Sequence, residues 1–178
     1  FLSIPENEIL RELISDLKAS LPMALETVEL FSGLKYPSLK RKTEYLAVKN
    51  GGKIAYINGD TIFSNTEFET DLDNYAYAFT ENIRVGSSTK YGTHDNQGFM
   101  VGALARVSLK PDDLNPKARY ALREIWGKKL PTYNSFHNNV AQAIEIVHLI
   151  EEAIKQLEIA TTHSKELARI PFVVKEGS

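Results

Sequence analysis

A carboxylate and an imidazole stand three residues apart at Glu145 and His148, and Glu152 follows four positions later. Residues at these spacings share one face of a helix, and four-helix proteins that bind two iron ions use the same Glu-x-x-His pattern. Such a di-iron site needs the pattern twice. None of the other three histidines has an acidic residue three positions before it. The single copy therefore favours a polar helix face over a di-iron centre.

A second candidate segment contains Gly98 and Gly102, with Arg106 four positions further on, in apolar surroundings. A phosphate-binding loop would need a third glycine or a following Lys-Ser or Lys-Thr, and neither is present. Close packing is the favoured alternative, because the small residues Gly98, Gly102, Ala103 and Ala105 let another element approach the backbone. Arg106 would then bind carboxylates or backbone carbonyls near that contact, since a guanidinium holds two acceptors at once.

Nucleophilic and thiol chemistry have little support in the sequence. No G-x-S-x-G pattern occurs, although the members of a Ser-His-Asp triad need not be close in sequence. His94 and Asp95 lie in a polar stretch and are interpreted as surface groups. The chain has no cysteine, which excludes disulfides, thiol nucleophiles and thiolate metal sites within these residues. This composition fits a reducing compartment, and we expect a cytoplasmic location.

Charge and hydropathy narrow the range of partners. The net charge is −2, and Lys40-Arg41-Lys42 is the only run of basic residues, so the sequence does not predict nucleic-acid binding. No apolar run approaches the roughly 20 residues of a membrane-spanning helix, so no membrane span is expected.

The elements that must position these side chains are expected to be mainly helical, with a small antiparallel β meander, an α+β fold built on a helical bundle. We expect one domain over residues 1–178. The apolar spacing predicts helices at about 5–31, 67–83, 116–126 and 134–160. Pro22 predicts a kink or break near Leu21.

The strand pattern and the end of the chain complete this prediction. Apolar runs separated by glycine-rich turns predict the meander at about 43–64. Residues 84–97 are expected to form a loop. A further short helix is expected at 163–170, and Pro171 would begin an extended tail.

Two blocks of sequence resemble the large subunit of nickel–iron hydrogenases, and most closely the cytoplasmic sulfhydrogenase and pyridine-nucleotide-linked type. They are "GFMVGALARVSL" (98–109) and "NSFHNNVAQAIEIVHLIEEAI" (134–154). The stretch "SSTKYGTHDNQG" (87–98) and the meander fit the same order. The resemblance covers most of the chain and is vague only in the first 40 residues.

The resemblance implies an excised middle segment of a hydrogenase large (alpha) subunit. That family holds a nickel–iron centre through two Cys-x-x-Cys pairs, one near each end, and contains a Glu-Ala-Pro-Arg-Gly segment that is absent here. No catalytic or metal-binding residue is therefore carried over, and no cofactor is expected in this segment. Arg106 and Glu145 remain candidates for polar contacts that support the metal ligands from outside, or that are purely structural.

The resemblance further implies an iron–sulfur small subunit as the partner. An excised segment should expose an apolar surface and could self-associate in a non-native way. Two alternatives stay open: a cysteine-free relative that has lost activity, and a stand-alone helical interaction or regulatory module without catalysis.

Overall fold

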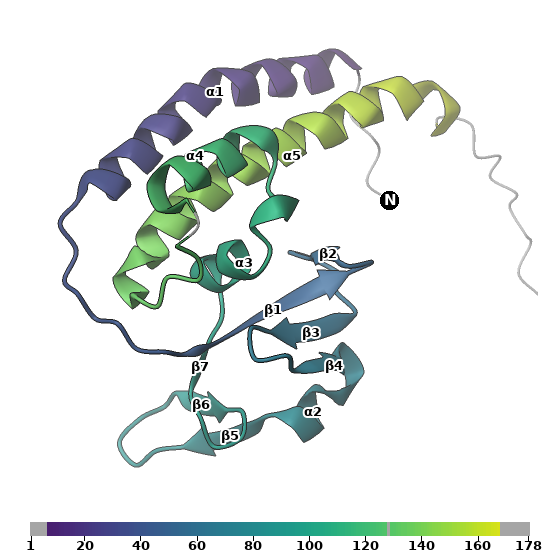
Figure 1. Ribbon diagram of the computed structural model, residues 1–178. Coiled ribbons are helices and arrows are strands. Elements are labelled where there is room, and N and C mark those ends of the chain that lie inside the picture. Colours follow the sequence, from purple (N-terminus) through teal and green to yellow (C-terminus); the bar gives the residue numbers. More distant parts are fainter. Residues whose placement is uncertain (1–6, 128, 168–178) are drawn as a thin grey trace, which may run out of the picture.

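Two long helices frame the molecule. The computed structural model describes residues 7–127 and 129–167. Helices α1 (Asn7–Gly33) and α5 (Asn138–Leu167) lie side by side and run in opposite directions (Figure 1). Lys18 in the first half of α1 accordingly donates a 2.8 Å hydrogen bond to Glu158 in the second half of α5.

Two shorter helices complete the helical layer, and its core lies between them and α5. These are α3 (Ala103–Leu109) and α4 (Pro116–Trp126). Nine members of the core are at most 1 % exposed: Tyr45, Leu104, Ala105, Val107, Ala118, Leu122, Ala141, Ile144 and Val147. Five of the nine are alanine or valine, and small side chains of this kind let helices pack closely. The burial of these apolar side chains is the main source of stability in this layer.

A small sheet packs beneath α3. It has the strand order β2-β1-β3-β4, all antiparallel, with β7 parallel to β1. Antiparallel pairing sets Val48 of β1 opposite Ile62 of β3. The strands are β1 (Glu44–Asn50), β2 (Lys53–Ile54), β3 (Thr61–Ser64), β4 (Glu69–Asp71) and β7 (Phe99–Met100).

A separate hairpin and four short helical turns connect these layers. Strands β5 (Thr80–Ile83) and β6 (Lys90–Thr93) pair with each other, below the main sheet in Figure 1. The short turns are η1 (Leu72–Asn74), α2 (Tyr75–Ala78), η2 (Pro111–Asp113) and η3 (Ser135–His137). Among the described residues, no helix combines the length and the apolar character that a membrane crossing requires.

The α+β prediction is confirmed, and so are most of the long elements. The helix expected at 116–126 has those bounds, and the helix expected at 5–31 is α1. Pro22 does not break α1, because buried Leu21, Ala24 and Val28 anchor the helix on both sides of the lost N–H.

The last helix is longer than expected. Instead of ending near 160, α5 continues to Leu167, so the separate short helix expected from 163 is wrong as far as the described residues reach. The extended tail expected from Pro171 lies outside the described residues.

The helix expected at 67–83 is wrong. The segment contains β4, η1, α2 and the start of the β5–β6 hairpin. Its aromatic spacing resembled one helical stripe, yet only Phe79 is buried there, while Leu72 and Tyr75 are over 40 % exposed. Backbone pairing of β4 with β3 replaces local helix formation, because tertiary contacts override weak local preference. The loop expected at 84–97 likewise contains β6.

Candidate functional site

The centre of the candidate site is an ion pair that joins α3 to α5. Arg106 Nε donates to Glu145 Oε1 at 2.6 Å, and Arg106 Nη2 donates to Glu145 Oε2 at 2.7 Å. The Glu145 side chain is 8 % exposed and that of Arg106 is 28 % exposed. Two parallel bonds of this kind fix both direction and distance, and they are stronger than bonds between neutral groups.

Tyr56 completes this cluster from the loop after β2. Its hydroxyl donates to Glu145 Oε1 at 3.1 Å, and the Arg106 guanidinium lies over its ring at 5.0 Å. The hydrogen bonds from Arg106 to Glu145 raise the pKa of the guanidinium. Burial, reinforced by the nearby Glu145 carboxylate, raises the pKa of the Tyr56 phenol well above its usual value. Tyr56 therefore acts as a neutral hydrogen-bond donor to the carboxylate.

The two glycines before Arg106 do not bring another element close to the backbone. A Cβ atom added at Gly98 or Gly102 would meet nothing within 4 Å, so close backbone approach is wrong at both positions. Gly102 is required for another reason: its φ of +95° and ψ of −160°, directly before α3, are almost restricted to glycine. Ala103 and Ala105, which were expected to contribute to the same close packing, are buried.

His148 and Glu152 share the face of α5 with Glu145, but their common partner is Asn115 and not Arg106. The backbone N–H of Asn115 donates to His148 Nδ1 at 3.0 Å. The side-chain amide of Asn115 donates to Glu152 Oε2 at 3.2 Å. Burial lowers the pKa of His148, which therefore stays neutral near pH 7. In this region the polar face joins α5 to the start of α4.

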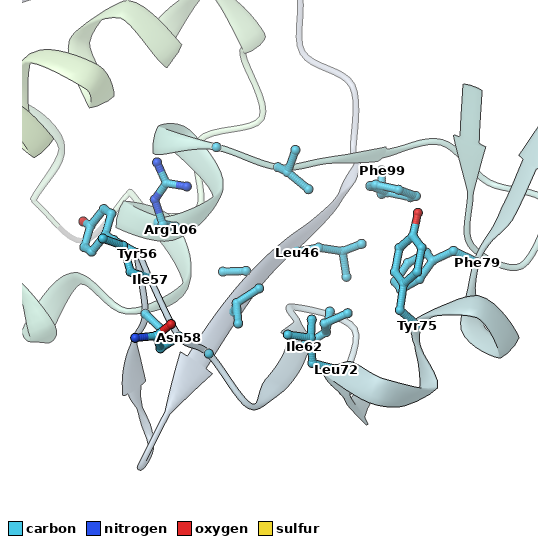
Figure 2. Close-up of a pocket in the computed structure, with 16 residues that line it drawn as sticks. Leu46, Tyr56, Ile57, Asn58, Ile62, Leu72, Tyr75, Phe79, Phe99 and Arg106 are labelled. Carbon is cyan, nitrogen blue, oxygen red and sulfur yellow. The ribbon is translucent and has the colours of Figure 1, made fainter. Parts of the chain in front are cut away.

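An apolar cavity of about 430 Å³ opens beside this cluster (Figure 2). Tyr56 and Arg106 lie at one end of it, Phe79 and Phe99 lie at the other, and Leu46 lies between them. The cavity lies over the β1–β3 face of the sheet. Its size and its few polar groups are typical of small-molecule or side-chain pockets.

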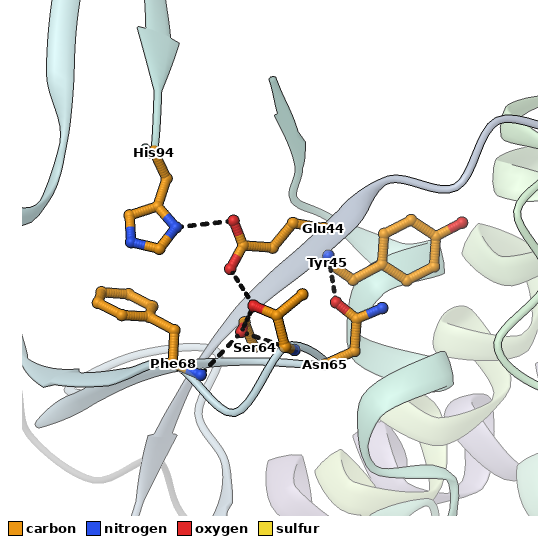
Figure 3. A network of polar contacts seen from close by, with 7 residues as sticks. Glu44, Tyr45, Ser64, Asn65, Phe68 and His94 are labelled. Atoms are coloured by element: carbon orange, nitrogen blue, oxygen red, sulfur yellow. Dashed lines mark hydrogen bonds and ion pairs between the residues drawn. The ribbon is translucent and has the colours of Figure 1, made fainter. Parts of the chain in front are cut away.

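A second polar network, around Glu44 and His94, was missed by sequence reasoning. His94 Nδ1 is 2.8 Å from Glu44 Oε2, and the Thr66 hydroxyl donates to Glu44 Oε1 at 2.7 Å (Figure 3). His94 is only 9 % exposed and lies on the Phe68 ring, with centroids 4.0 Å apart. The prediction that His94 is a surface group is therefore wrong, and its partner is 50 residues away along the chain.

This network perturbs the carboxylate at its centre. Burial raises the pKa of Glu44, but hydrogen bonds from Thr66 and His94 outweigh it and leave the pKa below its usual value. The ionised carboxylate fastens the loop after β6 to the first residue of β1.

One comparison with known proteins is informative. No protein-family model matches the chain. The sulfhydrogenase 1 alpha subunit of Pyrococcus furiosus is 34 % identical over 178 residues, which cover 99 % of this chain and 41 % of that subunit. The chain is therefore similar in sequence to part of a hydrogenase alpha subunit. It spans about two fifths of the length of this curated relative.

The nickel–iron centre that the resemblance implies does not fit the residues present here. Thiolates are the soft ligands that such a centre needs, and the chain has no cysteine. Within residues 7–127 and 129–167, no three histidine or acidic side chains converge on a point where a metal ion could bind. No residue of this segment is therefore assigned to the centre.

Proposed function

We propose that this chain is the middle scaffold segment of a nickel-dependent hydrogenase large subunit, whose full-length form reversibly oxidises dihydrogen. The supporting observation is the 34 % identity to a sulfhydrogenase alpha subunit across 99 % of the chain. The segment supplies the helical frame of the active site and none of its metal ligands, so it is inactive alone. The full-length protein is cytoplasmic and pairs with an iron–sulfur small subunit.

The antiparallel arrangement of α1 and α5 supports this proposal. The first residues of α1 and the last described residues of α5 lie at the same end of the molecule (Figure 1). In a longer polypeptide, the segments before α1 and after α5 would therefore emerge near each other. A centre held by one cysteine pair from each side of the segment requires that proximity.

The Arg106–Glu145 pair has a positioning role in this proposal. It joins α3 to α5 through two short bonds, which oppose sliding of one helix along the other. A frame of this stiffness keeps ligands supplied by neighbouring segments at constant distances.

Apolar side chains outside the core are the surface that such a segment offers to the rest of its subunit. On α1, Met23 and Leu30 are about two thirds exposed, and Leu13 is 43 % exposed. Contact with further polypeptide or with the small subunit would cover them, and without it the chain alone is expected to self-associate.

Two measurements test the proposal: the sequence of the gene on both sides of the region that encodes this chain, and metal analysis of the purified chain. We expect codons for a Cys-x-x-Cys pair on each side of the region encoding this chain. We also expect the purified chain to bind no nickel at stoichiometric level and to show no dihydrogen uptake with a dye acceptor, with an intact hydrogenase as the positive control.

Two results would contradict the proposal. A reading frame that begins at Phe1 and stops after Ser178 would favour a stand-alone interaction or regulatory module. Dihydrogen turnover by this chain alone would show that its own residues carry the chemistry.

A further inference from the structure

A polar cavity of about 390 Å³ lies where β2, α3, α4 and α5 meet. It is distinct from the apolar cavity, although Tyr56 and Arg106 line both. Its walls carry eight charged side chains: Lys53, Arg106, Lys110, Arg119, Lys155, Asp112, Asp113 and Glu152.

Several of these charges are neutralised within the protein. Arg106 pairs with Glu145, and Lys155 Nζ lies 3.6 Å from Glu152 Oε2. Asp112 pairs with Arg123 at 3.2 Å. These contacts contribute no net charge to the cavity.

The remaining charges are not balanced. Arg119 donates through Nε and Nη2 to the neutral carbonyl of Leu114, at 3.1 and 2.8 Å. Among the described residues, neither Lys53 nor Lys110 forms an ion pair, and Lys110 Nζ lies 5.9 Å from the centroid of the Phe63 ring. Asp113 accepts a backbone N–H at 2.8 Å and supplies one negative charge. Three cations against one carboxylate leave a surplus of about two positive charges.

His148 adds a neutral donor to this wall. Its Nδ1 accepts from the backbone N–H of Asn115, so the ring proton lies on Nε2. The ring is 9 % exposed and lines the cavity. An Nε2–H group in this setting donates a hydrogen bond and cannot accept one.

We propose that this cavity binds a small, doubly negative oxyanion of the phosphate class. Such a ligand balances the surplus charge of the lysines and accepts from His148 Nε2. Flexible lysine side chains suit an anion without a planar carboxylate geometry. A neutral or cationic ligand would leave the surplus charge uncompensated in a partly enclosed space. This inference is independent of the proposed hydrogenase role.

The experiment titrates the purified chain with inorganic phosphate at constant ionic strength, with chloride as the replaced ion. The imidazole resonances of His148 are followed by ¹⁵N NMR. We expect a saturable shift of Nε2, and a dissociation constant that rises about tenfold or more in the double variant Lys53→Gln/Lys110→Gln. Both lysines lie at the cavity edge, so folding should survive, and circular dichroism checks this.

The matched control is Lys35→Gln/Lys40→Gln, which removes the same charge from exposed positions that do not line this cavity. It should bind phosphate like the unmodified chain. If both double variants bound phosphate equally weakly, the loss of affinity would come from the change in net charge alone, and the proposal would be overturned. So would an unmoved His148 resonance at phosphate concentrations up to tens of millimolar, at which weak anion sites fill.

Discussion

Removal of the Arg106 side chain should be among the most destabilising single changes in the helical layer. The Glu145 side chain is 8 % exposed in the intact pair, and in Arg106→Ala its carboxylate would keep only the Tyr56 hydroxyl as a partner among the described residues. Breaking a buried pair from one side costs about 3–5 kcal/mol, because the remaining charge is desolvated and unpaired. That is a large part of the roughly 5–15 kcal/mol that stabilises a typical domain.

Glu145→Ala should cost less, about 2–3 kcal/mol, because the stranded guanidinium is already 28 % exposed and can turn toward water in the cavity. Replacing both residues with leucine leaves no orphaned charge and should cost less than either single truncation. The order of these three variants follows from the unequal burial of the two partners.

The assay is urea unfolding followed by circular dichroism at low protein concentration, which limits self-association. With a slope of about 2 kcal/mol per molar urea, Arg106→Ala should lower the midpoint by about 2 M. A double-mutant cycle on the exposed pair Lys18–Glu158 is the control, and it should give a coupling below about 1 kcal/mol. The reasoning fails if the Arg106–Glu145 cycle couples no more strongly than this surface pair.

Two further predictions concern the segments on either side of this pair. Gly102→Ala should destabilise the fold by about 1–3 kcal/mol because of its backbone conformation, while Gly98→Ala should change stability by less than about 0.5 kcal/mol; thermal unfolding compares the two. The lowered pKa of Glu44 means that its ionised form stabilises the fold at neutral pH, and that this contribution is lost as pH falls through the lowered value. Acid unfolding of Glu44→Gln should therefore depend less steeply on pH between about 5 and 3, and an unchanged slope would contradict this.

The long helices could be predicted because their residues carry the relevant information locally. In α5, Val140, Ile144 and Val147 repeat at intervals of three and four, and all are at most 2 % exposed. A helix needs only such a stripe and a neighbour to cover it. The helix prediction at 67–83 was wrong because the apolar residues of this segment belong to more than one element. No local sequence pattern indicates that part of the segment pairs with β3.

The candidate site could be predicted only in part, for a similar reason. Arg106 and Glu145 were both expected to make polar contacts, and they bind each other, but no sequence pattern predicted this pairing across 39 residues. The Glu44–His94 contact was not predicted, because its partners come from a strand and a distant loop. Side-chain pairs that join separate elements are decided by the packing of the whole chain.

Tyr56 and Arg106 form a common wall between the apolar cavity and the polar one. Because the two cavities share these side chains, a displacement of the phenol ring or the guanidinium in one cavity changes the surface of the other. A ligand that displaces either side chain in one cavity would therefore couple to binding in the other cavity through these two residues.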